Sequence, residues 1–225
     1  RSSNRKRKRR RGRTILNNVC KIIGPPGTGK TTTLLRLVEE QLSEGREPDR
    51  IGYFSFTKKA TTEAIDRACE KFKLPRKDLK WFRTLHSLAY QWLGCTHTDI
   101  IQRHDFKDFY KEYGIDISKS IKTDDVVVGG EDEGLNLLDL YRVKNTSLEE
   151  EFRKHGHVKG GLQRLQRIDK AYRMFKKSRG VKDYTDLITE FNKIGQCPRL
   201  DIVIVDEVQD LKPNEWEMIM IMLRQ

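Results

Sequence analysis

The chain has 225 residues, 36% of them hydrophobic and 35% charged, which is polar for a globular protein but leaves enough apolar sequence for one core. No run of about 18 apolar residues occurs, which argues against a membrane span. The start is basic and has no apolar stretch, so we do not expect it to act as a secretory signal.

The positive charge is concentrated at the start of the chain. Residues 1–13 hold nine Arg or Lys residues and no acid, so that only +3 of the net charge of +12 belongs to the remainder. A run of this kind cannot pack into a core, and we predict a disordered basic tail over 1–13. Three roles stay open for it: contact with nucleic-acid phosphates, a nuclear address, or a solvated arm without a specific partner.

The four cysteines, Cys20, Cys69, Cys95 and Cys197, are widely scattered and form no C-x-x-C pair. We therefore expect reduced thiols in an intracellular protein, with neither a zinc site nor a disulfide framework. The sequence does not choose between nucleus, nucleoid and cytoplasm. Because the first residue is Arg1 rather than Met, we expect the chain to be a fragment or a processed product.

Strand-like and helical patterns alternate at both ends of the chain. Strands are expected where apolar, β-prone runs occur, and helices where apolar residues recur at helical spacing. In chain order we predict a strand over 15–23, a helix over 31–45, a strand over 50–57, a helix over 59–72, a strand over 80–86, a helix over 87–93, a strand over 200–207 and a helix from Pro213. This alternation is typical of an α/β fold with a doubly wound parallel sheet and helices on both faces.

The middle of the chain breaks the alternation. Residues 95–192 show patches of helical periodicity, such as "LQRLQRIDKAYRMFKK", without a succession of strands. We predict a largely helical inserted subdomain over 95–192, set into an α/β domain made of residues 14–94 and 193–225.

The stretch "GPPGTGKTTT" has the pattern of a phosphate-binding loop between a strand and a helix. Its glycines let backbone N–H groups turn toward phosphate oxygens, and the helix start adds its positive dipole end. Lys30 supplies a charge to the same oxygens, and the Thr31 hydroxyl is a ligand for Mg²⁺. The predicted nucleotide-binding residues are Gly24, Pro25, Pro26, Gly27, Thr28, Gly29, Lys30, Thr31 and Thr32.

Two acids end the last predicted strand, in "VIVDEVQD". Asp206 and Glu207 would lie at the carboxyl edge of the sheet, where open α/β sheets bind ligands. There Asp206 can hold Mg²⁺ and Glu207 can polarise an attacking water, as nucleoside triphosphate hydrolysis requires. The alternative is a strand that ends in two solvated acids.

Further polar and aromatic side chains follow the second and third predicted strands. Phe56, Thr57 and Lys58 offer an aromatic ring, a hydroxyl and a cation, the combination that holds single strands without sequence preference. Thr84 and His86 lie at the next strand-to-helix turn. Alternatively, Phe56 belongs to the core and His86 is structural.

"GPPGTGKTTT", "FSFTKKATTEA", "TLHSLAY" and "VIVDEVQD" follow one another in the order of the motifs of superfamily 1 helicases of the UvrD/Rep-like branch, which this sequence resembles over roughly residues 15–215. "YRMFKKSRGVKDYTDLI" is also similar to the segment that precedes the acidic motif in that family. The resemblance implies a RecA-like ATP-binding motor domain with a helical insertion.

The resemblance also implies roles for single residues. Lys30, Asp206, Glu207 and Gln209 would be catalytic, with Gln209 coupling the nucleotide state to strand contact. Thr31 and Asp206 would hold Mg²⁺. The positions implied to touch single-stranded DNA are Phe56, Thr57, Lys58, Thr84 and His86.

Two positions depart from the family pattern. Lys58 stands where Asn is usual, and Val208 stands where Ala is commoner. We also find no glutamine motif upstream of the phosphate loop.

The later motifs of the family are absent before Gln225. They supply a second RecA-like domain with arginine fingers, so we expect that domain in a missing C-terminal part or in a partner chain. As it stands, the chain should bind ATP and Mg²⁺ and contact a strand, but it should hydrolyse ATP slowly and not unwind a duplex.

Several functions remain open. The resemblance favours the ATP-binding half of an ATP-dependent DNA helicase that moves 3′ to 5′ on single-stranded DNA. A non-catalytic, ATP-responsive nucleic-acid-binding or regulatory module is the first alternative, and an RNA-directed motor is the second. A small-molecule kinase would leave the strand-contact motifs unexplained.

Overall fold

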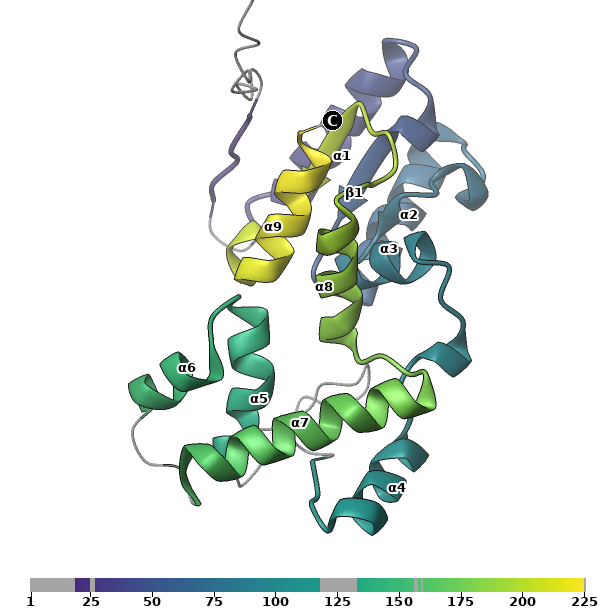
Figure 1. Ribbon diagram of the computed structural model, residues 1–225. Coiled ribbons are helices and arrows are strands. Elements are labelled where there is room, and N and C mark those ends of the chain that lie inside the picture. Colours follow the sequence, from purple (N-terminus) through teal and green to yellow (C-terminus); the bar gives the residue numbers. More distant parts are fainter. Residues whose placement is uncertain (1–18, 25–26, 118–132, 156–157, 159, 225) are drawn as a thin grey trace, which may run out of the picture.

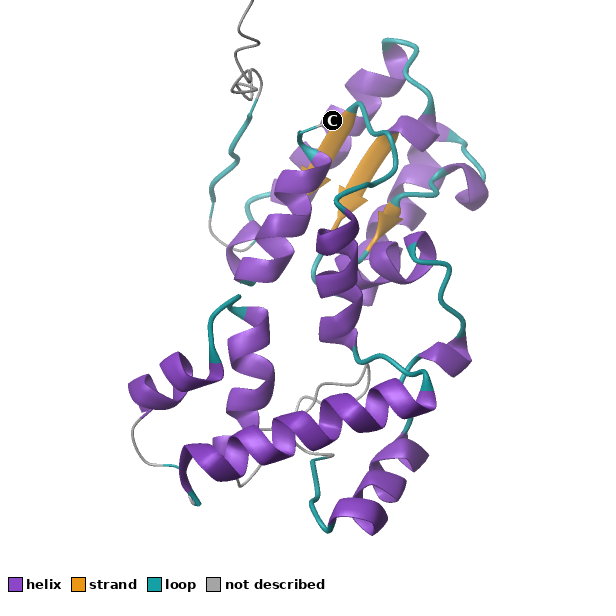
Figure 2. Cartoon of the chain, in the orientation of Figure 1, coloured by secondary structure: helices purple, strands orange, loops and turns teal. Residues whose placement is uncertain are grey.

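The computed structural model describes residues 19–24, 27–117, 133–155, 158 and 160–224. Within these ranges a small parallel sheet is flanked by α-helices, and further helices extend away from it (Figure 2). The predicted tail over 1–13 lies outside the described residues.

The described residues form three parallel strands in the order β2-β1-β3. These are β1 (Ile51–Phe54), β2 (Phe82–Arg83) and β3 (Ile202–Val205), with Tyr53 opposite Phe82 and Ile204. Because the strands are parallel, their carboxyl ends lie at one edge of the sheet. The α/β fold class predicted from the sequence is confirmed.

Helices cover both faces of the sheet. Leu35 and Val38 of α1 (Lys30–Ser43) and Ala64 and Ala68 of α2 (Lys58–Phe72) pack in one cluster with Tyr53. Phe54, the next residue along β1, packs on the other face among α3 (Leu85–Trp92), α8 (Tyr184–Ile194) and α9 (Pro213–Met222). The alternation of side chains along a strand explains how one buried strand serves two cores. Figure 1 shows α8 and α9 in front of the sheet.

Four further helices surround a core of their own. They are α4 (Arg103–Tyr113), α5 (Glu133–Val143), α6 (Leu148–His155) and α7 (Gly161–Arg179). Phe109, Leu165, Tyr172 and Phe175 are among the side chains buried between them. In Figure 1 these helices lie below α8 and α9.

Short 3₁₀ turns complete the described elements: Pro48–Arg50, Arg76–Asp78, His97–Asp99 and Val208–Asp210. No helix among the described residues is long and apolar enough to cross a membrane.

The predicted domain boundary at residue 192 falls inside α8. The buried side chains of α8, Leu187, Ile188 and Phe191, belong to the cluster on the sheet rather than to the core of α4 to α7. The division at residues 95 and 192 therefore stays a prediction, with α8 as the element that connects the two cores.

The predicted strand over 15–23 is wrong for its described part. Residues 19–23 form no strand, and Val19 and Ile23 are 68% and 80% exposed. An apolar run becomes a strand only where a neighbouring strand supplies backbone partners, and no described strand pairs with these residues. Residues 15–18 lie outside the described part of the chain.

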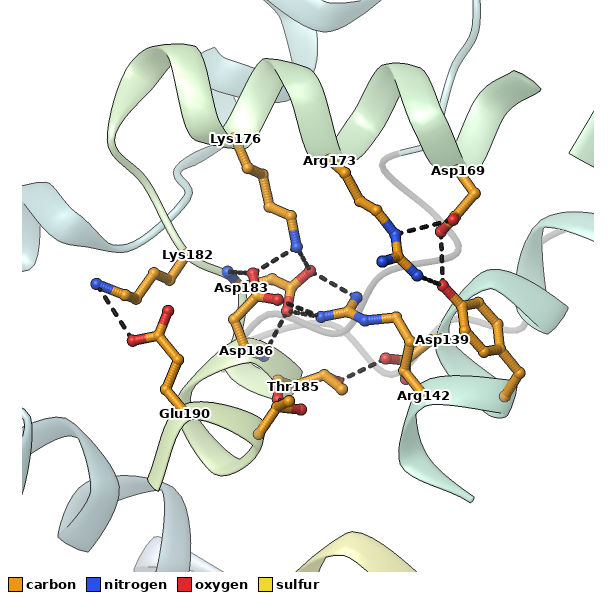
Figure 3. Close-up of polar contacts among 12 residues, drawn as sticks. Asp139, Arg142, Asp169, Arg173, Lys176, Lys182, Asp183, Thr185, Asp186 and Glu190 are labelled. Carbon is orange, nitrogen blue, oxygen red and sulfur yellow. Dashed lines mark hydrogen bonds and ion pairs between the residues drawn. The ribbon is translucent and has the colours of Figure 1, made fainter. Parts of the chain in front are cut away.

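A network of buried charges joins α8 to the lower helices (Figure 3). Arg142 of α5 forms two hydrogen bonds with the Asp183 carboxylate, at 2.8 and 2.7 Å, and one with Asp186 at 2.6 Å. Lys176 of α7 lies 2.6 Å from Asp183 and also contacts Asp186. Asp183 in turn caps the start of α8 by accepting from the Asp186 N–H at 2.9 Å. The network fixes the turn between α7 and α8.

Candidate nucleotide site and strand-binding groove

The glycine-rich loop leads directly into α1. Gly27 and Gly29 have φ angles of 80° and 79°, in the left-handed region that favours glycine. Thr28 lies close to the backbone of Gly24, because a Cβ at residue 24 would be only 2.5 Å from Thr28 Oγ1. Pro25 and Pro26 lie outside the described residues. The described glycines therefore have the conformations that let a phosphate approach the backbone closely.

The start of α1 suits an anion. Gly29 caps the helix without a side-chain hydrogen bond, and the first turn contains no acid. The N–H groups at the helix start and the positive end of its dipole therefore face no competing carboxylate of that turn. Lys30 Nζ donates to Gly24 O at 2.9 Å, which places the ammonium group against the loop.

Asp206 connects three elements at the carboxyl edge of the sheet. It follows β3, its N–H donates to Phe54 O of β1 at 2.8 Å, and its side chain is buried. Thr31 Oγ1 of α1 lies 3.3 Å from Asp206 Oδ2. The structure thus brings the predicted magnesium pair together from residues 175 positions apart.

Tyr53 is a residue of this site that sequence reasoning missed. Its hydroxyl donates to Asp206 Oδ2 at 2.9 Å. Burial, followed by the charge of Asp206, raises the pKa of Tyr53 well above its usual range, so the hydroxyl stays a donor. The available signal was a tyrosine inside a buried strand, because a buried Tyr hydroxyl normally finds a partner.

Glu207 has a constrained backbone. Its φ angle of 53° is in the left-handed region, which is unusual for a residue other than glycine. Its N–H donates to Asp206 Oδ1 at 3.0 Å, and Gln209 Nε2 donates to its carboxylate at 2.5 Å. Non-glycine residues in this conformation cluster at functional sites, and here the conformation and Gln209 together orient the carboxylate.

The oxygen atoms present fit Mg²⁺. A hydroxyl and a buried carboxylate within hydrogen-bond distance are hard oxygen ligands, and Mg²⁺ uses one or two carboxylates together with waters and substrate phosphates. Among the described residues, no three or more His, Cys, Asp or Glu side chains gather into a metal site. Mg²⁺ that is held partly by waters and substrate phosphates does not need such a site.

A groove of about 1080 Å³ lies beyond the ends of β1 and β2. Lys58, Thr84 and His86 are among the residues that line it. Residues of the segment 97–107 also line it, as do Arg179, Val181 and Tyr184. Three of the five residues predicted to touch a nucleic-acid strand are therefore brought together.

The other two are placed differently. Phe56 and Thr57 come shortly after β1 but do not line the groove, and Phe56 is 47% exposed. Thr57 Oγ1 accepts from the Ala60 N–H at 3.1 Å and so caps α2. Thr84 is also a cap, because its Oγ1 accepts from the Ser87 N–H at 3.2 Å. Each threonine thus fixes the start of a helix at the sheet edge.

His86 connects the groove to the helix that follows the acidic motif. Its Nδ1 lies 3.9 Å from Glu215 Oε1, and its ring meets the Tyr184 ring edge-on at 5.7 Å. Glu215 is buried and accepts from the Lys212 N–H at 2.8 Å, which caps α9. Because α9 follows the turn after Glu207, the acidic motif and His86 have a short structural connection.

A phosphate loop and paired acids at one edge of a parallel sheet define a P-loop nucleotide-binding domain. The chain matches the family model of the UvrD/REP helicase N-terminal domain over residues 5–225, and it belongs to that family. It is also similar to the RecBCD enzyme subunit RecD of Buchnera aphidicola subsp. Acyrthosiphon pisum (strain APS), with 43% identity over 49 residues. That match spans 22% of this chain and 8% of the RecD protein.

Proposed function

We propose that this chain is the nucleotide-binding half of an ATP-dependent helicase or translocase that acts on single-stranded DNA. The observation that carries the proposal is the shared sheet edge. Asp206 and Glu207 follow β3, Lys58 follows β1, and Thr84 and His86 follow β2. Residues for triphosphate chemistry and residues for a polyanionic strand therefore follow parallel, hydrogen-bonded strands.

In this proposal each residue has one task at the nucleotide. The N–H groups at the start of α1 and the Lys30 ammonium group bind the phosphates of ATP. Thr31 and Asp206 would hold Mg²⁺, which when bound neutralises negative charge on the phosphate oxygens. Glu207 accepts a proton from the attacking water, and Gln209 orients the Glu207 carboxylate through their hydrogen bond.

On the strand side, Lys58 attracts phosphates, and His86 and the exposed ring of Phe56 offer surfaces on which bases stack. The family suggests movement from 3′ to 5′. A second RecA-like domain, from the same polypeptide or from a partner chain, would complete the ATP site, since arginine fingers raise turnover by about 10³ to 10⁵ in related enzymes.

The proposal predicts that single-stranded DNA accelerates ATP hydrolysis. In the full-length protein, saturating oligo-dT should raise the steady-state rate at least tenfold, and Lys30→Ala should abolish the DNA-dependent part. Oligo-U of the same length, assayed in parallel, tests whether the strand is DNA or RNA.

A rate that DNA leaves unchanged would contradict the motor proposal. A different result would support a non-catalytic module instead: the parent protein shows no ATP turnover, and the Lys30→Ala variant still binds DNA.

A further inference from the structure

The groove beside Lys58, Thr84 and His86 is also lined by cations that no motif predicted. These exposed cations, Arg103, Lys107 and Arg179, lie on α4 and at the end of α7. We call these three residues the α4 wall. We propose that the α4 wall binds the phosphates of a single strand held between it and the sheet edge. This inference rests on the proposed function and adds a binding surface to it.

The charged side chains that line the groove are nearly all cations. Its lining includes the cations Lys58 and the α4 wall, but one acid only, Asp105, among the described residues. Asp105 is 4% exposed, and its Oδ2 accepts from the Gln102 N–H at 2.7 Å. Its carboxylate therefore caps α4, while the side chains of Arg103 and Lys107 are exposed to solvent.

Arg103 and Lys107 lie on the same side of α4. They are four residues apart, which places them on one face of the helix, about 6 Å apart along its axis. Both side chains are exposed, and both line the groove. The two positive charges therefore lie in a row along the helix. A row of charges can contact successive phosphates of one strand.

The α4 wall is held firmly against the rest of the molecule. Ile101 N donates to Lys182 O at 2.9 Å, and Lys182 N donates to Asp99 O at 2.7 Å, so the segment before α4 is paired with the turn between α7 and α8. Arg179 lies 3.5 Å from Asp108 and stacks over the Phe175 ring at 5.2 Å. In Figure 1 the segment that descends from α3 to α4 passes this turn.

The lining also contains rings on which bases can stack. Tyr90 and Tyr184 line the groove together with His86. Cations that track a backbone and rings that stack bases are the two components of binding sites for single strands. The groove volume of about 1080 Å³ leaves room for more than one nucleotide.

The test compares two double variants by fluorescence anisotropy with labelled oligo-dT at several salt concentrations. Arg103→Gln with Lys107→Gln removes two charges from the α4 wall. Arg167→Gln with Lys170→Gln removes one Arg and one Lys from exposed positions of α7 that do not line the groove. The basic segment 1–13 is present in all proteins, and thermal unfolding verifies that each variant is folded.

We expect the α4 wall variant to bind about 3- to 10-fold more weakly near physiological salt. Its plot of log affinity against log salt should be less steep by roughly 1.4, because each lost phosphate contact to a single strand removes about 0.7. The α7 control should bind like the parent, and Lys58→Gln should weaken binding as well.

Unchanged affinity and salt slope in the α4 wall variant, with weaker binding by Lys58→Gln, would overturn this inference and leave the proposed function standing. Equal losses in both double variants would also overturn it, since general charge would then explain binding. A parent protein that does not bind oligo-dT would contradict the inference and the proposed function together.

Discussion

Replacing Glu207 with Gln is expected to lower the single-turnover rate of ATP hydrolysis in the full-length protein by roughly 10²- to 10⁴-fold, the contribution of a general base. The amide has nearly the same shape and can still accept the hydrogen bond from Gln209 Nε2. What it loses is the ability to take a proton from water. Rapid-quench measurement of product formation with excess enzyme gives the rate directly.

Nucleotide affinity separates this effect from a damaged site. Because the start of α1, Lys30 and Thr31 are untouched, the Glu207→Gln variant should bind an ATP analogue with the parent's affinity. Asp210→Asn is a matched control, since it makes the same acid-to-amide change at an exposed position of the same turn. A Glu207→Gln variant that hydrolyses ATP at the parent's rate would remove Glu207 from the mechanism.

Replacing Asp183 with Ala is expected to lower the free energy of unfolding by about 3–5 kcal/mol, as for other buried ion pairs that lose one partner. Asp183 is 1% exposed, and its loss would leave Arg142 and Lys176, both largely buried, without their shared carboxylate. The cap of α8 would be lost as well. Urea unfolding followed by circular dichroism measures the change.

A surface ion pair provides the control for Asp183. Glu150 pairs with Lys154 at 2.8 Å, but both side chains are about half exposed. Exposed pairs contribute about 0.2–1 kcal/mol, so Glu150→Gln should change the free energy of unfolding by less than 1 kcal/mol. Equal effects of the two substitutions would show that the buried network has no special role.

The same buried network makes the free energy of unfolding depend on pH. Burial alone would raise the pKa of Asp183, but Arg142 and Lys176 hold this pKa well below its usual range. A carboxyl group whose pKa is lower in the folded than in the unfolded state stabilises the fold above its unfolded pKa of about 3.9. Its contribution is lost as the pH falls below that value. The Asp183→Ala variant should therefore lose less stability than the parent between pH 5 and pH 3.

The sequence predicted those elements whose signal is local. "IGYF" and "IVIV" are apolar runs that end in polar residues, and both form strands of the sheet. Thr57 precedes α2 and Thr84 precedes α3, which is where capping residues are expected. The phosphate loop and the acidic pair could be found for the same reason, because their chemistry lies in a few consecutive residues.

What could not be predicted depends on contacts between distant residues. The role of Tyr53 requires that Asp206, 153 positions later, lies beside its hydroxyl. The α4 wall requires the pairing of Ile101 with Lys182, which no local pattern encodes. The apolar residues Val19 and Ile23 gave a strand signal, but a strand also needs a paired neighbour.

The most direct test of a shared sheet edge is the coupling between nucleotide and strand. The affinity for oligo-dT is measured with and without a saturating non-hydrolysable ATP analogue, and the affinity for the analogue is measured with and without oligo-dT. Linkage requires the two affinities to change by the same factor, and we expect a factor of about 5 to 150 in the parent and none in Lys30→Ala. If neither ligand changes the affinity for the other, the claim that the two sites share one sheet edge is contradicted.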